Sequence, residues 1–410
     1  MEEDWREVSV IMLKQKIMRR QIMKRILGVA VLILAFTVGS AMAETPKPIK
    51  VGAFFALSGP AAFIGTPTKL VAQMAVDQIN KDGGINGRPL ELVFGDTEGD
   101  PTKAVAIAKK FIYVDKVVAI IGPTRTGTGM AVKKLVEQAH VPTIMTVGGD
   151  PVIMGGKFGS YSYIFKTPQR SSIAVKKILI YLQKKGIKDV AILTSSDGFG
   201  RDGKRWLLKL APQYDIKVVS QESFNPSDTD MTSQLVNIRS KKPQAIICWT
   251  IGPAGSIVAK NVKQLGIKVP LIQCHGLPGP KYVELAGDAA SGSIMPSTKL
   301  MAWQQLPNGD IQKPVIARFV HLYKDVYHYD REFPINTHSG YAWDALMILS
   351  QAMEKSGPDR EKLRDAIEGT KGYVGISGVY SFTPQDHNGL GVDSMIIVKV
   401  QNGSWVLESY

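Results

Sequence analysis

Two short stretches of the sequence combine residue types that phosphate binding or catalysis requires. The first is GFGRDGKR at residues 198–205, which follows an apolar run and has the glycine and lysine spacing of a phosphate-binding loop. Such a loop needs a serine or threonine after the lysine to hold magnesium, but Arg205 occupies that position. We therefore interpret the glycines as places where the backbone approaches a neighbouring group closely.

The second stretch pairs Cys274 with His275 at the end of another apolar run. A metal site needs three or four ligands, and the sequence has no HExxH, CxxC or HxxxH pattern to supply the others. It also lacks the GxSxG turn of α/β-hydrolases. These absences predict a protein that is not an enzyme and that uses no metal or cofactor.

The distribution of charge argues against a nucleic-acid partner. The chain has a formal net charge of +14, but its lysines are scattered, as in residues 176–185. No basic run is interleaved with aromatic residues, which is the pattern that nucleic-acid binding favours. An anionic partner or a negatively charged membrane surface stays open as an explanation of the excess charge.

The N-terminal segment predicts export. A basic pair precedes a continuous apolar run over residues 26–38, and small residues frame a cleavage point at Ala43. The run is shorter than the roughly 20 residues that a membrane-spanning helix needs. We expect residues 1–43 to be an export signal that is removed, with Met23 or Met18 as the true start; a retained membrane anchor is the alternative.

Apolar runs typical of strands alternate with amphipathic stretches typical of helices. Strands are expected at residues 49–57, 89–97, 117–122, 142–147, 189–195, 216–224, 244–250, 269–274 and 293–296, and helices at residues 67–81, 102–113, 127–139, 171–185, 200–210, 231–240, 254–265, 314–327, 338–355 and 359–368. The C-terminal tail predicts two or three antiparallel strands. The alternation predicts parallel βαβ architecture in two doubly wound halves, with a ligand at the carboxyl ends of the strands.

The two cysteines lie on strands that this architecture places side by side. Cys248 and Cys274 each fall near the end of a predicted strand. Neighbouring strands are about 4.8 Å apart, which is compatible with the Cα separation of a disulfide. The pleat of the sheet can instead direct the two side chains to opposite faces, and we favour two separately buried thiols over a bridge.

Several motifs follow one another in a fixed order: IKVGAFFALSGPAAFIG, GGINGRPLELVFGDTEGDPTKAV, VVAIIGPTRTGTGMAV, HVPTIMTVGGDP, DGFGRDG and DTDMTSQLVNIRSKKPQAII. In this order they resemble the periplasmic branched-chain amino-acid-binding proteins, which are type I substrate-binding proteins of ABC importers. The resemblance implies an α/β fold of the type I periplasmic binding protein class, with two Rossmann-like doubly wound lobes joined by three crossovers around a central cleft. It places the first lobe at residues 44–167 and 298–373 and the second at residues 168–297 and 374–410.

The resemblance also implies a function. The chain would be a monomeric periplasmic protein that captures a small hydrophobic carboxylate or amino acid and delivers it to the ABC permease subunits in the membrane. The alternative from another class is an extracellular ligand-sensing lobe that signals to a partner protein.

Carried over position by position, the resemblance implies ligand contacts from both lobes. Thr126, at a helix N-terminus, would place a hydroxyl on the ligand carboxylate. The full implied set is Leu57, Ser58, Gly59, Thr124, Arg125, Thr126, Thr128, Val147, Gly148, Gly149, Phe199, Ile251 and His275. A helix cap is the alternative role for Thr126, and an ordinary loop histidine is the alternative for His275.

Three of these positions depart from the family pattern. Gly149 lacks the hydroxyl and Phe199 lacks the phenol of the amino-acid binders, and His275 stands near the acidic residue that pairs with the ligand ammonium. The departures affect the amine end of the site and leave the carboxylate end intact. The candidates are therefore a branched-chain amino acid, as the family implies, and a related amine-free aliphatic or aromatic acid, as the departures imply. We expect the ligand to lack an α-amine unless one of three acidic residues supplies the missing charge: Asp150, Asp197 or Asp202.

Overall fold

The computed structural model describes residues 12, 14, 16–26 and 46–410 of the chain. Residues 48–410 form one compact unit. Most of the predicted export signal, namely residues 1–11, 13, 15 and 27–43, lies outside the described residues. Among the described residues, no helix has both the length and the apolar composition needed to cross a membrane.

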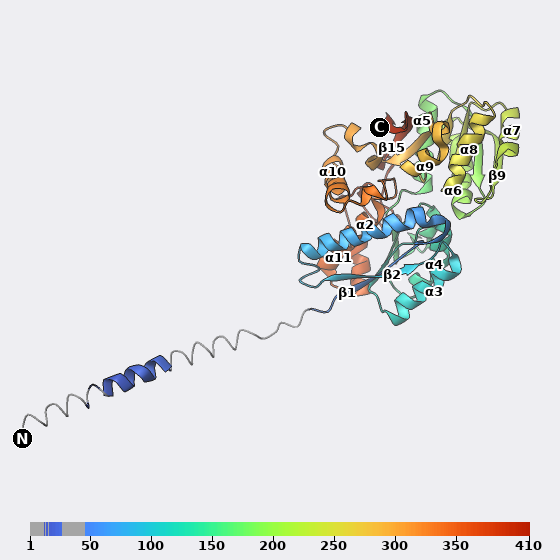
Figure 1. The fold of residues 1–410 in the computed structure, drawn as a ribbon. Helices are drawn as coiled ribbons and strands as arrows, with labels where there is room; N and C mark the ends of the chain where they lie inside the picture. Colours follow the sequence, from blue (N-terminus) through green and yellow to red (C-terminus); the bar gives the residue numbers. More distant parts are fainter. Residues whose placement is uncertain (1–11, 13, 15, 27–45) are drawn as a thin grey trace, which may run out of the picture. The chain divides into compact units, whose positions relative to one another are not determined.

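The first sheet contains five parallel strands in the order β2-β1-β3-β4-β7 (Figure 1). They are β1 (Ile49–Phe55), β2 (Leu90–Asp96), β3 (Ala119–Ile121), β4 (Thr143–Met145) and β7 (Ile164–Lys166). Every residue of β1 except Lys50 is buried, as expected for a central parallel strand that is covered on both faces. Val51 and Phe55 join one hydrophobic core, whereas Phe54 points to the other face and joins a second core.

Helices cover both faces of this sheet. They are α2 (Ala62–Lys81) and α11 (Tyr341–Ser356) against the first core, α3 (Pro101–Lys109) and α4 (Thr126–Gln138) against the second, and α12 (Arg360–Glu368), which contacts α11. In Figure 1, α2 and α11 lie together on one side of the strands and α3 and α4 on the other. We call the first sheet and these helices the first lobe.

The second sheet has seven strands in the order β16-β15-β12-β11-β10-β8-β9. Its parallel strands are β8 (Asp189–Ser195), β9 (Lys217–Phe224), β10 (Ala245–Trp249), β11 (Leu271–Gln273) and β12 (Ile294–Thr298). β15 (Met395–Gln401) and β16 (Ser404–Ser409) add to it in antiparallel fashion, as the tail of the sequence predicted. The accompanying helices are α5 (Ser171–Lys184), α6 (Gly198–Leu210), α7 (Thr232–Ser240), α8 (Pro253–Gln264) and α9 (Pro280–Ala286). This sheet and its helices form the second lobe.

The chain passes between the two sheets three times: after β7, after β12 and before β15. The segments near these passages are bonded to one another. Asn388 Nδ2 donates to the carbonyl oxygens of Lys166 (3.2 Å) and Pro168 (2.8 Å), and Thr167 Oγ1 donates to the Tyr341 carbonyl oxygen at 2.9 Å. The predicted architecture of two doubly wound lobes joined by three crossovers is confirmed.

Smaller elements complete the chain. They are α10 (Lys313–His321), the hairpin of β5 (Met154–Gly156) and β6 (Gly159–Ser160), and the hairpin of β13 (Tyr373–Val374) and β14 (Val379–Tyr380). The helices predicted over residues 102–113 and 314–327 are shorter than expected, because α3 and α10 each continue into a π-helical turn.

The start of α2 is the clearest local error of the sequence prediction. The sequence predicts a helix over residues 67–81, which puts Pro67 in its first turn, a position that proline favours. In the structure α2 begins at Ala62 and Pro67 lies inside it. Gly65 permits this earlier start, because a Cβ at Gly65 would lie 2.0 Å from the carbonyl oxygen of Ala56, which follows β1.

The strand register explains the state of the cysteines. Cys248 of β10 is paired with Gln273 of β11, so these two side chains point to the same face of the sheet. Cys274 is one residue further along and points to the opposite face, where its Sγ donates to the Thr250 carbonyl oxygen at 2.9 Å. Both cysteines are free and buried, as the sequence analysis favoured.

Thiol counting tests this arrangement. We expect two reactive thiols per chain in unreduced protein that is denatured before labelling, and almost none in native protein, since burial raises the pKa of both thiols. A denatured chain that yields no free thiol would contradict the strand register.

Candidate functional site

A cavity of about 260 Å³ lies between the two lobes. It is lined by loops that follow parallel strands of both sheets. Ligands of open α/β sheets bind at these carboxyl ends of the strands. We call it the inner cavity. Its lining consists of Ile64, Gly99, Pro101, Thr124, Arg125, Thr126, Gly127, Thr146, Val147, Gly148, Pro168, Asp197, Gly198, Phe199, Ile251, His275, Gly276, His338 and Tyr341.

Most of the residues implied by the family resemblance meet in this lining. The structure brings together Thr124, Arg125, Thr126, Val147, Gly148, Phe199, Ile251 and His275. They come from loops that are far apart in the sequence and belong to both lobes. The residues that the resemblance implied on each lobe therefore line the same cavity.

The other implied residues do not line the inner cavity. The backbone N–H of Leu57 donates to Asp96 Oδ1 at 2.8 Å, the Ser58 hydroxyl donates to Asp96 Oδ2 at 2.7 Å, and Gly59 follows in the same loop. Thr128 Oγ1 donates to the carbonyl oxygen of Arg125 within the first turn of α4, at 2.7 Å. Gly149 sits behind Thr126, because a Cβ at Gly149 would lie 2.4 Å from Thr126 Cγ2.

Three helices begin at the inner cavity. Thr126 and Gly127 open α4, Gly198 and Phe199 open α6, and Tyr341 opens α11. The first N–H groups of a helix have no partner within the helix, and the aligned peptide dipoles give that end a partial positive charge. The Asp197 carboxylate already caps the end of α6, because it accepts from the Gly200 backbone N–H at 2.9 Å. The ends of α4 and α11 therefore favour a negatively charged group in the cavity.

Two threonine hydroxyls add donors on the first-lobe side. Thr124 Oγ1 accepts from the backbone N–H of Ala56 (2.9 Å) and Thr126 Oγ1 accepts from that of Gly149 (3.3 Å). Among the described residues neither hydroxyl has an acceptor of its own, so both protons are available to a ligand. Thr146 differs, since its hydroxyl already donates to the Pro123 carbonyl oxygen at 2.8 Å.

One ion pair crosses from lobe to lobe at the cavity. Arg125 Nη2 of the first lobe lies 3.2 Å from Asp197 Oδ2 of the second. The other carboxylate oxygen, Asp197 Oδ1, accepts from the backbone N–H of Gly200 (2.9 Å) and from the Ser195 hydroxyl (3.0 Å). The only acidic side chain in the described lining is therefore already engaged on both oxygens.

The two other acidic candidates lie behind the cavity. Asp150 is buried and accepts from Arg170 Nε (3.0 Å) and from the Ser172 hydroxyl (2.6 Å). Asp202 accepts from the backbone N–H of Asp150 (2.9 Å) and from Arg205 (2.7 Å), and burial raises its pKa. Neither carboxylate lines the inner cavity, so neither faces a ligand there.

His275 is buried and uncharged. Burial, together with the nearby positive charge of Lys166, lowers the pKa of its imidazole to about 3. Its ring packs against Phe199 and Trp249, with ring centroids 5.5 and 5.4 Å away, and its Nδ1 has no partner among the described residues. A neutral imidazole can donate one hydrogen bond and accept another, but it cannot neutralise an ammonium group.

The glycines of residues 198–205 serve close packing. A Cβ on Gly200 would lie 1.8 Å from the Ser195 carbonyl oxygen, and one on Gly203 would lie 2.4 Å from the Trp249 ring. These glycines let α6 lie directly on β8 and on the end of β10. The interpretation of this stretch as a place of close backbone approach is supported by these contacts.

The geometry of the cleft can be compared with known proteins. A family model described as periplasmic binding protein matches residues 48–404. The chain belongs to the periplasmic binding protein family. Members of this family are solute-binding proteins and not enzymes, and the family implies a location outside the cytoplasm.

Curated relatives of this periplasmic binding protein have low sequence identity over most of their length. The Leu/Ile/Val-binding protein BraC3 of Rhizobium johnstonii is 24% identical over 328 residues, which cover 79% of this chain and 84% of the relative. The leucine-, isoleucine-, valine-, threonine- and alanine-binding protein of Pseudomonas aeruginosa is 26% identical over 343 residues, which cover 82% of this chain and 86% of the relative.

Solved structures share the fold of this periplasmic binding protein. An extracellular ligand-binding receptor from Rhodopseudomonas palustris has a TM-score of 0.80 at 26% identity, covering 88% of this chain and 99% of the receptor. Another is the branched-chain amino-acid transporter substrate-binding protein LivJ from Streptococcus pneumoniae, solved with isoleucine. It has a TM-score of 0.76 at 24% identity, and the match covers 88% of this chain and 99% of the LivJ chain.

Sequence reasoning missed part of the cavity of this periplasmic binding protein. His338 and Tyr341 reach it from the return of the chain to the first lobe, and no motif marks them. Gly127 and Thr146 lie next to implied residues in the sequence, so a wider window around Thr126 and Val147 would have included both.

Replacing Gly148 by alanine tests the contact between the lobes of this periplasmic binding protein. A Cβ at Gly148 would lie 2.9 Å from His275 Nε2 and 3.1 Å from Phe199 Cε2, both on the other lobe. We expect Gly148→Ala to separate the lobes and to cost about 1–3 kcal/mol of unfolding free energy through overpacking. Small-angle X-ray scattering would show a larger radius of gyration, and urea unfolding a lower stability.

Gly127→Ala is the matched control. Gly127 also lines the inner cavity, but a Cβ there would have no heavy atom within 4 Å. We expect its radius of gyration and stability to follow the wild type. Equal behaviour of the two variants would contradict the close interlobe contact at Gly148.

Proposed function

We propose that this chain is a periplasmic solute-binding protein that captures a small hydrophobic carboxylate in the inner cavity and delivers it to an ABC importer. The ligand is an amine-free aliphatic or aromatic acid, and the protein acts as a monomer after removal of the export signal near Ala43. The observation that carries the proposal is the convergence of the α4 and α11 N-termini on one interlobe cavity, where Asp197 already caps the N-terminus of α6.

The carboxylate end of the site is on the first lobe. Thr124 and Thr126 offer hydroxyl protons there, and the opening residues of α4 offer backbone N–H groups. Hydrogen bonds to a charged acceptor are worth roughly 1.5 to 3 kcal/mol each, more than bonds between neutral groups. Arg125 lies at the same helix end, where its guanidinium is paired with Asp197.

The remainder of the cavity suits an apolar body. Phe199 and Ile251 line it from the second lobe, and Ile64 and Val147 line it from the first. Apolar surface buried against such side chains contributes about 25 cal/mol per Å². A ligand with one charged end and a hydrophobic body matches both parts of the lining.

The amine end lacks what an amino acid requires. Asp197 is held by Arg125 and by its own helix, Asp150 and Asp202 lie outside the lining, and His275 is neutral. Burying an ammonium group without a partner costs several kcal/mol, which is comparable to the whole binding energy of a micromolar ligand. This balance favours an amine-free acid, although the two curated relatives carry amino acids in their names.

A titration series with matched ligands tests this choice. Leucine and 4-methyl-2-oxopentanoate have the same carbon skeleton but differ in the amine, and benzoate supplies an aromatic body. We expect isothermal titration calorimetry to give at least about tenfold tighter binding for an amine-free acid than for leucine. The free energy needed to bury one unpaired ammonium exceeds the roughly 1.4 kcal/mol that corresponds to a factor of ten in affinity.

Two results would contradict the proposal in different ways. Leucine that binds tenfold more tightly than both acids would return the ligand to the branched-chain amino acids. A series in which no carboxylate binds, and none raises the melting temperature, would contradict the solute-binding role of the inner cavity.

The substitution Thr126→Val tests the carboxylate end. Valine keeps the shape of threonine but removes the hydroxyl that we expect to donate to the ligand. Loss of one charge-assisted hydrogen bond should weaken binding about tenfold to a hundredfold. Calorimetry against the best acid of the series measures the change.

Thr146→Val is the matched control for Thr126→Val. Thr146 lines the same cavity, but its hydroxyl already donates to the Pro123 carbonyl oxygen and so has no proton for a ligand. We expect its affinity to stay close to that of the wild type. Unchanged affinity in Thr126→Val would restrict Thr126 to a structural role at the start of α4.

A further inference from the structure

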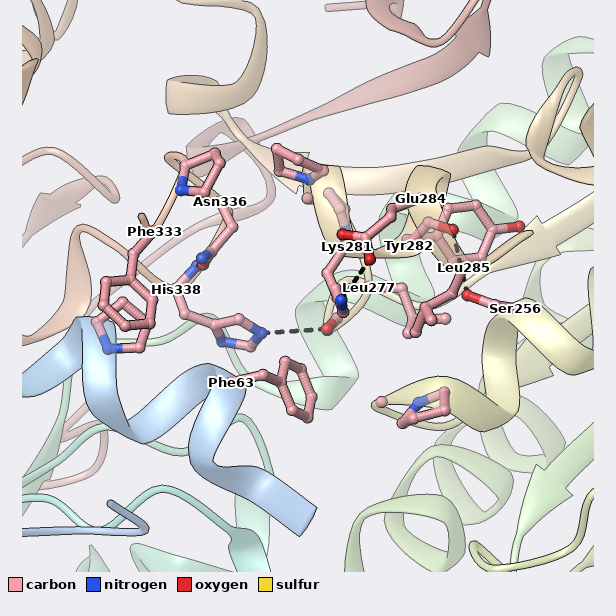
Figure 2. Close-up of a pocket in the computed structure, with 18 of the residues that line it drawn as sticks. Phe63, Ser256, Leu277, Lys281, Tyr282, Glu284, Leu285, Phe333, Asn336 and His338 are labelled. Atoms are coloured by element: carbon pink, nitrogen blue, oxygen red, sulfur yellow. Dashed lines mark hydrogen bonds and ion pairs between the residues drawn. The ribbon is translucent and has the colours of Figure 1, made fainter. Parts of the chain in front are cut away.

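A second cavity, of about 330 Å³, adjoins the inner cavity. Gly276 and His338 line both, so only the thickness of these residues separates the two spaces. Figure 2 shows the second cavity with Phe63 and His338 on one side and Leu277, Tyr282 and Leu285 on the other. We call it the outer cavity.

Three short segments give neighbouring residues to the two cavities. In α2, Phe63 lines the outer cavity and Ile64 lines the inner one. The same division separates Gly252 from Ile251, and Leu277 from His275. At these three places a single segment of chain separates the two cavities.

Two side chains complete this wall. His338 Nε2 lies 3.1 Å from the Gly276 carbonyl oxygen, the contact drawn as a dashed line in Figure 2. Phe63 of the first lobe approaches Gly252 of the second, where a Cβ would lie 3.5 Å from Phe63 Cζ. Both closures are made by side chains, and neither is a continuous stretch of backbone.

The outer cavity offers an apolar surface. Phe63, Leu277, Leu285 and Phe333 line it, together with several prolines. Three polar side chains at this surface are bonded to other protein groups. The Ser256 hydroxyl donates to the Tyr282 carbonyl oxygen (3.2 Å), the Tyr282 hydroxyl is 2.7 Å from the Ser293 hydroxyl, and Asn336 Oδ1 accepts from the backbone N–H of His338 (2.9 Å).

Charges are found only at the edge of the outer cavity. Lys281 forms an ion pair with Glu284, both side chains are more than half exposed, and Glu332 is exposed as well. Since the described lining leaves no unpaired charge inside, the space suits hydrocarbon and not a second charged ligand.

We propose that the outer cavity receives the apolar tail of a carboxylate whose charged end is bound in the inner cavity. The ligand class is then an acid with an extended alkyl or arylalkyl tail. The proposal rests on the proposed function, because the inner cavity must hold the carboxylate. The tail enters as His338 turns away from the Gly276 carbonyl oxygen and the Phe63 ring moves aside.

The sizes of the two cavities agree with this class. Pockets for small molecules usually measure about 300–1,000 Å³. The inner cavity alone, at about 260 Å³, lies just below this range, whereas the two cavities together lie well within it. A short acid fills the inner cavity, and a longer one has nowhere to extend except past the shared wall or out of the cleft.

Calorimetry with the unbranched acids from butanoate to decanoate tests the proposal on the full protein. Each methylene that enters the outer cavity should tighten binding about fourfold, the factor expected for one buried CH₂. Leu285→Trp fills the outer cavity, so we expect it to abolish this gain for the long acids while the short acids still bind. Leu208→Trp, on an exposed position of α6 outside both linings, is the matched control and should keep the gain.

The outcomes separate this inference from the proposed function. If short acids bind but affinity stays flat or falls with length, the tail subsite is wrong and the function stands. The tail subsite is equally wrong if Leu285→Trp keeps the full gain with chain length. If no acid of any length binds, the proposed function itself fails.

A second measurement needs no variant. Decanoate with a photoreactive diazirine at its far end is bound, irradiated and located by mass spectrometry. We expect labelled peptides that contain residues 277–285 or 332–336, which line the outer cavity. Labels confined to peptides of the inner cavity, or spread over the surface, would overturn the proposal.

Discussion

The architecture depends on the hydrogen bonds that satisfy buried backbone where the chain passes between its two sheets. Each passage carries peptide groups through a region without strand partners, and an unpaired buried peptide group is costly. Asn388, Gln169 and Asp344 supply the missing partners: Asp344 accepts from the backbone N–H groups of Ile376 and Ser377 (both 2.8 Å), and Gln169 donates to the Ser377 carbonyl oxygen. Burial raises the pKa of Asp344 to about 6, so this carboxylate is held in place against a substantial desolvation penalty.

These bonds place the inner cavity. The first passage follows β7 and contains Thr167 and Pro168, and the second leads into α11 with Tyr341 at its start. Thr167 bonds to the Tyr341 carbonyl oxygen, so the floor of the cleft and the start of α11 are fixed to each other. The helix ends that give the cavity its positive character are thus positioned by polar contacts outside the ligand space. An apolar core alone would not specify that arrangement, because apolar packing has no directional preference.

The fold was largely predictable from the sequence because parallel strands covered on both faces read as continuous apolar runs, as in β1 and β10. The early start of α2 was not predictable, since it depends on how closely Gly65 approaches Ala56, and that distance exists only in the folded chain. The same limit applies to the site. Thr126 and His275 lie in motifs that are visible in the sequence. His338 and Tyr341 reach the cavity where the chain returns to the first lobe, and no local sequence pattern predicts where that segment ends. The loop of Leu57 and Ser58 belongs to a motif but does not line the cavity, because its polar groups are bonded to Asp96.

The position of Trp249 makes its fluorescence sensitive to occupancy of the inner cavity. Its indole is fully buried at the end of β10, with its ring centroid 5.6 Å from that of Phe199 and 5.4 Å from that of His275, and both of those rings line the inner cavity. Any occupant that displaces either ring changes the immediate surroundings of the indole, and tryptophan emission responds to such changes in polarity and in quenching by neighbours. The chain therefore contains its own fluorophore at the junction of the cleft and the second-lobe core, and its emission can follow occupancy in real time without an attached dye.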